Sequence, residues 1–213
     1  MVKFLRLYHS ELRISYLTLV NLNLLDFENS LFSSFLLNAQ GIHAGFFVLG
    51  ENLQSRLLKS RPEGVRKLYA EQCLWSHGYV HKSHQSYKEW KNSLSKTEQL
   101  ISSVKTNSKI FFRPPYGQRH VELMRYLEQH TSRAILWNMD SQDWHSRMSG
   151  DDVLARVQKL MLAWRKGIIL FHDIHPKGLK ALPALVEAMK RSRLEQIASA
   201  ISLLQGRVKR ACF

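Results

Sequence analysis

Short apolar segments alternate with amphipathic segments through the middle of the chain, and this alternation limits the folds that are open to it. Residues 42–49 and 167–171 are short, strongly apolar runs of the kind that form buried strands. Residues 63–72, 121–129 and 151–166 instead carry their apolar residues at helical spacing. Strands separated by helices are typical of a parallel sheet covered by helices. The sequence therefore predicts an α/β fold.

Other segments extend the same pattern. The helices predicted there cover residues 31–40, 90–107 and 181–190, and the strands cover residues 110–112 and 134–139. Beyond residue 190 the sequence is basic and helix-like as far as Arg210, with no further apolar run that could form a strand. The regular alternation thus belongs to the middle of the chain.

Composition limits the domain organisation and the partners. A chain of 213 residues fits one domain, so we predict a single domain over residues 1–213. The formal net charge of +14 favours acidic partners, which include nucleic acid, anionic lipid and acidic cell-wall polymers. The Lys and Arg residues are scattered and no aromatic-plus-basic RNA-binding motif occurs, so no specific nucleic-acid site is expected. Cys73 and Cys212 are too few for a disulfide framework or a thiolate zinc site.

The N-terminal region contains no clear targeting signal. Residues 1–13 are basic with scattered apolar residues, but Glu11 and Arg13 interrupt them before any apolar core. Residues 14–25 are rich in apolar side chains, yet the run is too short to span a bilayer. We therefore expect neither a standard export signal nor a transmembrane segment, and the compartment stays open.

Polar segments follow the predicted strands, and they contain side chains suited to hydrolytic chemistry. The segments are Ser76–His81, Phe112–Gly117, Asp140–Trp144 and Leu170–Asp173. The carboxyl ends of parallel strands meet at one edge, where the loops of barrel enzymes build their active sites. Within the first segment, two histidines four residues apart can direct both imidazoles at one divalent cation, although an isolated pair at this spacing is more often structural.

In this order, and with Phe46–Gly50 ahead of them, the four segments resemble the motifs of the polysaccharide deacetylases that share the NodB homology domain, carbohydrate esterase family 4. The resemblance is strongest over residues 41–186, and residues 1–40 and 187–213 are atypical. It implies a distorted or incomplete (β/α) barrel. It also implies a monomeric, metal-dependent hydrolase that removes N-acetyl groups from an N-acetylglucosamine-containing polysaccharide such as chitin or peptidoglycan.

The resemblance assigns roles to residues of the first two segments. His77 and His81 match the two histidine ligands of the metal, which is zinc, or cobalt or another divalent ion. Arg113 matches a residue that orients the carboxylate acting as general base. The backbone amide of Tyr116 matches a group that stabilises the oxyanion. His84 fits the motif less well, and we expect it to be a surface residue.

The other two segments match the remaining parts of the family site. His172 matches the general acid that protonates the leaving amine, and Leu170 matches a residue that lines the pocket for the acetyl methyl group. Trp144 matches a groove wall that offers an apolar face to a sugar ring. Asp143 matches a supporting carboxylate, with His172 or Arg113 as its partner. A core histidine and a core tryptophan are the structural alternatives for these positions.

One family motif has no counterpart. The family opens with a strand that ends in an Asp-Asp pair, the general base and the third metal ligand, and spacing back from Phe46 places it within residues 19–23. Asn21 and Asn23 lie there, and an amide cannot act as a base. Asp26 or Glu28 could substitute, but each also suits a helix start or the surface. Three hypotheses therefore remain: a polysaccharide deacetylase, a catalytically inactive carbohydrate-binding relative, and a protein whose basic surface binds a polyanion.

Overall fold

The computed structural model describes residues 15–21, 27–59, 62–105, 110–130, 133–164 and 167–191. Within this part of the chain, parallel strands form one five-stranded sheet in the order β3-β2-β1-β5-β4. The strands are β1 (Ser15–Asn21), β2 (Gly45–Val48), β3 (Cys73–Ser76), β4 (Met139–Asp140) and β5 (Gly167–His172). The longest strands, β1 and β5, lie side by side near the middle of the sheet.

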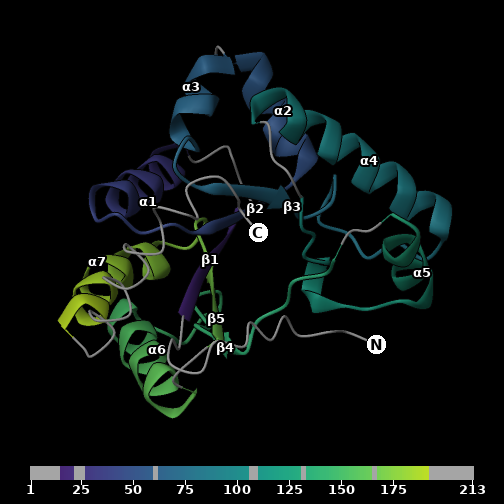
Figure 1. Ribbon diagram of the computed structural model, residues 1–213. Coiled ribbons are helices and arrows are strands. Elements are labelled where there is room, and N and C mark those ends of the chain that lie inside the picture. The colour runs from purple at the N-terminus through teal and green to yellow at the C-terminus, as the bar shows by residue number, and fades with distance from the viewer. Residues whose placement is uncertain are drawn as a thin grey trace, which may run out of the picture.

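Helices surround the strands on the outside, as Figure 1 shows. They are α1 (Phe27–Ala39), α2 (Gly50–Lys59), α3 (Pro62–Leu68), α4 (Tyr87–Val104), α5 (Val121–Gln129), α6 (Gly150–Trp164) and α7 (Pro176–Arg191). Neighbouring helices contact one another in the order α6, α7, α1, α3, α2, α4, α5. None of the described helices is long and apolar enough to cross a membrane.

The sheet curls toward closure through the segment that leads into β4. Phe112 forms isolated parallel bridges with Ser76 on one side and with Ala134 on the other. Five residues later, Met139 pairs with Ile169 of β5 at the opposite edge of the sheet. This segment therefore runs from the β3 side to the β5 side and joins the two edges by a few backbone contacts. The result is a distorted (β/α) barrel, as predicted.

Side chains of the central strands alternate between two apolar layers. Phe46 and Val48 of β2 pack in the main core, which also contains buried residues of the surrounding helices. Phe47 lies between them in sequence and contacts a separate cluster with Trp75 and Phe111. Because successive side chains of a strand point to opposite faces, one layer faces the helices and the other faces the barrel interior.

Most predicted helices are confirmed, but several strands differ from the prediction. The strands expected over 110–112 and 134–139 are reduced to single bridges and the two-residue β4, because Pro114 and Pro115 prevent a longer ladder after the first of them. The apolar pattern by itself also misses β1, β3 and α2, although the resemblance places the end of a strand within residues 19–23, where β1 ends. Each of the two strands is short and includes polar residues, and α2 begins at a glycine and carries few apolar side chains. The helix-like residues beyond 191 lie outside the described part of the chain.

Candidate functional site

The carboxyl ends of four strands meet at one edge of the sheet. Asn21 at the end of β1 pairs with Val48 at the end of β2, which in turn pairs with Ser76 at the end of β3. On the other side of β1, Val20 pairs with His172, the last residue of β5. The residues that follow β3 and those at the end of β5 are therefore brought to the same edge, where the sequence predicts the site.

His77 follows β3 and is held there by its neighbours. Its backbone N–H donates to the Val48 carbonyl at 2.8 Å, and its ring Nδ1 lies 2.7 Å from the carbonyl oxygen of Arg113. Because a carbonyl only accepts, Nδ1 carries the proton and the lone pair of Nε2 stays available, the arrangement found in metal-bound histidines. Gly78 then turns the chain at φ +90°, a conformation that favours glycine.

His77 and His81 lie close together, with ring centroids 5.1 Å apart. Burial lowers the pKa of His77 well below its usual range, and the neighbouring His81 lowers it further. Burial also lowers the pKa of His81, with a second contribution from His172. Both imidazoles are therefore held neutral, which is the form that binds a metal ion.

The imidazoles of His77 and His81 are chemically suited to bind a divalent cation. No group of three or more His, Cys, Asp or Glu side chains that could hold a metal occurs within the described ranges. Asn21 and Glu28 belong to β1 and α1, but their side chains are not described, and Asn23 and Asp26 lie outside the described residues. The two neutral imidazoles thus fit a divalent cation as a partial site.

His172 forms a hydrogen-bonded pair with Asp143. The ring Nδ1 of His172 lies 2.7 Å from Oδ1 of the carboxylate, and the backbone N–H of His172 donates to Oδ2 at 2.7 Å. Asp143 is fully buried, while His172 is partly exposed. The carboxylate therefore fixes both the strand end and the imidazole orientation, and leaves Nε2 of His172 free to exchange a proton. Of the two partners considered for Asp143, the structure has it contacting His172.

Arg113 is fully buried and has few polar partners. Its Nε donates to the Ile135 carbonyl at 3.0 Å, and its guanidinium carbon lies 4.1 Å from the ring centroid of Phe47 and 5.4 Å from that of Trp137. Its two terminal nitrogens are buried and have no hydrogen-bond partner among the described residues. Burial lowers the pKa of Arg113 to about 9. The site therefore contains a guanidinium that aromatic rings surround and that no described carboxylate neutralises.

Tyr116 and Trp144 both present aromatic rings to solvent. Tyr116 is 65% exposed, adopts a left-handed backbone conformation at φ 58° and packs its ring 4.5 Å from that of His81. Trp144 is 49% exposed, and its indole N–H points to Asp140 Oδ1 at 3.4 Å. Leu170 is instead buried within β5. The substrate-binding roles of these residues stay predictions.

Asp140 is a structural residue of the site that the sequence does not single out. Its carboxylate accepts hydrogen bonds from the indoles of Trp137 and Trp144 and from the backbone of Gln142 at 2.8 Å. An Asp two residues before a turn residue can form such an Asx turn, so the signal is present in the sequence. Asp140 therefore links the ring beside Arg113 to the exposed ring of Trp144.

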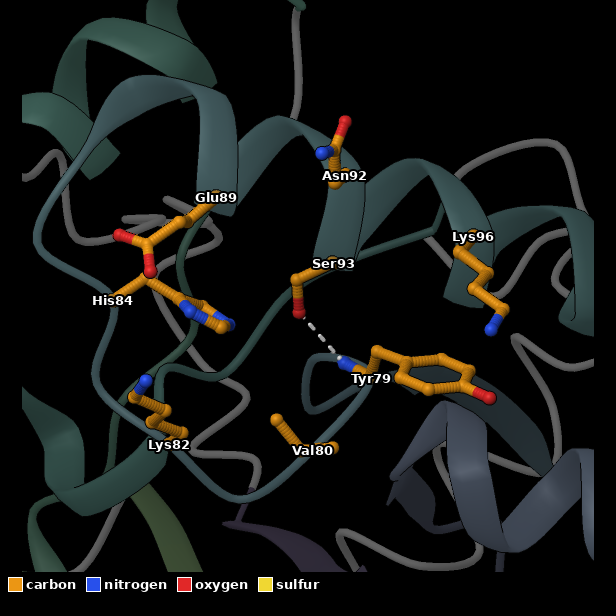
Figure 2. A pocket seen from close by; sticks show the side chains of 8 residues that line it. All are labelled: Tyr79, Val80, Lys82, His84, Glu89, Asn92, Ser93 and Lys96. Carbon is orange, nitrogen blue, oxygen red and sulfur yellow. Dashed lines mark hydrogen bonds between the residues drawn. The ribbon is translucent and has the colours of Figure 1, made fainter.

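A pocket lies beside this edge, between the loop that carries His81 and the first turns of α4 (Figure 2). His84 lines it, and here the prediction of a surface residue is wrong. His84 is only 8% exposed because its ring packs edge-on against Trp90, with ring centroids 4.9 Å apart. The chain between His81 and His84 thus turns inward toward α4.

Comparisons with known proteins agree with this architecture. The family model for polysaccharide deacetylase matches residues 34–135. A peptidoglycan-N-acetylglucosamine deacetylase of Bacillus cereus is 28% identical over 198 residues, which cover 87% of this chain and 68% of that protein. The peptidoglycan-N-acetylmuramic acid deacetylase PdaC of Bacillus subtilis is 27% identical over 150 residues, 69% of this chain and 30% of that protein. The chain thus spans about two thirds of the first relative and less of the second.

Solved structures share the fold. A family 4 carbohydrate esterase from Streptomyces lividans, in complex with acetate, has a TM-score of 0.68 at 24% identity and covers 83% of this chain and 88% of its own. BA3943, a CE4 family pseudoenzyme from Bacillus anthracis, has a TM-score of 0.68 at 23% identity, covering 85% and 62%. A mutant of BA3943 with restored enzymatic activity has a TM-score of 0.70 at 24% identity, covering 85% and 64%. In sequence and in fold, the chain is thus similar to the polysaccharide deacetylases, carbohydrate esterase family 4.

Proposed function

We propose that this protein removes N-acetyl groups from an N-acetylglucosamine-containing polysaccharide, chitin-like or peptidoglycan-like. The observation that carries the proposal is the convergence at one sheet edge of a neutral histidine pair and a histidine oriented by a buried carboxylate. Amide hydrolysis needs a site that polarises the carbonyl and a group that protonates the leaving amine. A divalent cation held by His77 and His81 would polarise the carbonyl toward attack by water, and His172 suits the transfer of a proton to the amine as the C–N bond breaks.

The residues of this chain contribute distinct parts of the reaction. His77 and His81 would hold a divalent cation, zinc, cobalt or a related ion, which supplies Lewis acidity toward the acetamide carbonyl when bound. His172 would protonate the amine through Nε2, because Nδ1 is engaged by Asp143. The backbone N–H of Tyr116 would donate to the oxyanion, and the exposed rings of Tyr116 and Trp144 would contact the sugars.

Acetate release from N-acetylated chito-oligosaccharides, with zinc or cobalt added, tests this proposal. The substitution His172→Asn should lower kcat by about 10²- to 10⁴-fold, the usual contribution of a general acid. His175→Asn is the matched control on the same turn, since its ring lies 5.7 Å from that of His172 but contacts no Asp143 oxygen in the described structure. An equal loss in both variants, or a wild-type rate that neither alters, would contradict the role of His172.

A second function, carbohydrate binding without catalysis, is favoured by one specific observation. The terminal nitrogens of Arg113 lack a hydrogen-bond partner among the described residues, at the place where the family has its general base. The CE4 family pseudoenzyme BA3943 shares this fold, so the fold also occurs in a protein described as a pseudoenzyme.

Catalysis and binding without catalysis predict different effects of an added carboxylate on the rate of acetate release. If the base is missing, variants that place Asp at Asn21, Leu22 or Asn23, singly and in pairs, should create acetate release in a protein that otherwise only binds the oligosaccharide. If the wild type already releases acetate, the same variants should leave the rate unchanged or lower it. Titration calorimetry with the oligosaccharide, run beside the acetate assay, separates binding from turnover.

A further inference from the structure

The pocket beside the site has no part in the proposed hydrolysis, yet its lining is chemically specific. It has a volume of about 320 Å³ and is lined by Tyr79, Val80, Lys82 and His84 of the loop after β3 and by Glu89, Asn92, Ser93 and Lys96 of α4. Figure 2 shows these side chains arranged around an open space between the loop and the helix. A hydrogen bond joins the loop to the helix beside this space, because Ser93 Oγ accepts from the Tyr79 N–H at 2.8 Å.

The charge that the pocket offers to a ligand is positive. Lys82 and Lys96 are exposed, and neither forms an ion pair with another described residue. Lys96 Nζ sits 3.7 Å from the ring centroid of Tyr79, so the ammonium stays at the pocket wall. Glu89 also lines the pocket and keeps its negative charge, so the two lysines leave a net positive charge there. Its Oε2 accepts from the Ser86 backbone at 3.1 Å and from the Ser86 hydroxyl at 3.0 Å.

His84 supplies a second, independent observation. Both of its ring nitrogens are buried and have no hydrogen-bond partner within the described part of the chain. Its ring points toward the pocket, between Lys82 and Ser93 in Figure 2. A buried polar group without a partner costs free energy, which a ligand that hydrogen-bonds to it would recover. Together with the free ammonium groups, His84 makes the pocket complementary to a group that carries anionic oxygens.

We propose that this pocket binds a carboxylate substituent of the polysaccharide, and that the protein therefore prefers an acid-bearing polymer to a neutral one such as chitin. The inference rests on the proposed function. One continuous loop carries His77 and His81 at the site and Lys82 and His84 at the pocket, so the pocket adjoins the place where the polymer would bind. The net charge of +14 favours the same class of acidic partner.

Calorimetric binding to two matched oligosaccharides and to inorganic phosphate tests the proposal with the full chain. The first probe is a neutral N-acetylglucosamine tetrasaccharide, and the second is a tetrasaccharide in which alternate sugars carry a lactyl ether carboxylate. The wild type should bind the acidic probe about tenfold more tightly, as a charge-assisted contact allows. Lys96→Met and His84→Phe should each reduce that preference and leave the Kd of the neutral probe unchanged.

A control on the same helix separates a specific contact from general charge. Lys88→Met and Lys91→Met remove the same charge from exposed positions of α4 outside the pocket, and they should keep the preference for the acidic probe. Equal effects of all the lysine variants would overturn the proposal in favour of a diffuse electrostatic attraction.

The remaining outcomes distinguish this inference from the proposed function. Equal binding of both oligosaccharides by the wild type would overturn the pocket proposal and leave the proposed function standing. Absence of binding to either oligosaccharide would contradict the proposed function itself. Phosphate binding that depends on Lys96 and His84, without any preference for the acidic oligosaccharide, would show an anion site unconnected with the polymer and would also overturn the proposal.

Discussion

Arg113 departs from ordinary interior packing because it is a buried charged side chain. Arg113 lies between Phe47 and Trp137 with its terminal nitrogens unsatisfied by any described residue. A buried charge without a counter-charge is costly, and ionisable groups with strongly perturbed pKa values cluster at functional sites. The energetic cost of burying Arg113 therefore depends on whether a carboxylate pairs with its guanidinium.

The substitution Arg113→Met tests this directly. Methionine fills a similar length without a charge, so the free energy of unfolding should stay within about 1 kcal/mol of the wild type or rise. Trp90→Ala, which empties a buried position, should instead cost about 3–5 kcal/mol and serves as the reference for a damaged core. Denaturant unfolding measures both. A loss of more than about 3 kcal/mol for Arg113→Met would mean that a carboxylate pairs with the guanidinium in the folded protein.

The pH dependence of stability reports on His84. Burial lowers its pKa, with Glu89 acting against the shift and Lys82 adding to it. Because the folded pKa lies below the unfolded value near 6.5, the stabilisation is present above pH 6.5 and is lost as the pH falls through the folded pKa. The unfolding free energy of the wild type should therefore fall more steeply below pH 6.5 than that of His84→Phe. Parallel curves for the two proteins over that range would show that His84 is not held neutral by the fold.

At the scale of elements, the helices were more predictable than the strands. The helix predicted over residues 121–129 coincides with α5, because its apolar residues recur at helical spacing. The strands that the apolar pattern misses, β1 and β3, mix polar and apolar residues without a strict alternation or a continuous apolar run. Sheet formation here depends on neighbours distant in sequence, as with β1, which lies between β2 and β5.

Close packing within β2 and β3 gives a prediction for one glycine. A Cβ atom on Gly45 would lie 2.2 Å from the indole ring of Trp75, which is buried against Phe47. The substitution Gly45→Ala should therefore destabilise the protein by about 1–3 kcal/mol through overpacking. Gly64→Ala is the control, since a Cβ atom there meets nothing within 4 Å on an exposed position of α3. It should be neutral or stabilising by up to about 1 kcal/mol. Equal unfolding midpoints for the two variants would contradict the tight contact.

The fold of the whole molecule brings residues that are more than ninety positions apart in sequence to the same edge of the sheet. The motifs with His77, Arg113, Asp143 and His172 could be found in the sequence because each follows a strand or a rigid turn. Their convergence depends on the register of the parallel strands, which the sequence does not give. The sequence also leaves open whether Asp143 contacts His172 or Arg113, and the structure has it contacting His172. The pocket was not predictable, since it needs His84 to turn inward onto Trp90.

The measurement that most directly tests the proposed site is metal content and acetate release in the same sample of full-length protein after incubation with zinc and dialysis. The proposed site should hold about one zinc ion per chain in the wild type, which should release acetate from chito-oligosaccharides. His77→Ala should lose both, whereas His130→Ala, whose ring stacks on Tyr126 away from the sheet edge, should retain both. Wild-type protein that is folded but holds no zinc and releases no acetate would contradict the proposed metal site, as would full zinc content and activity in His77→Ala.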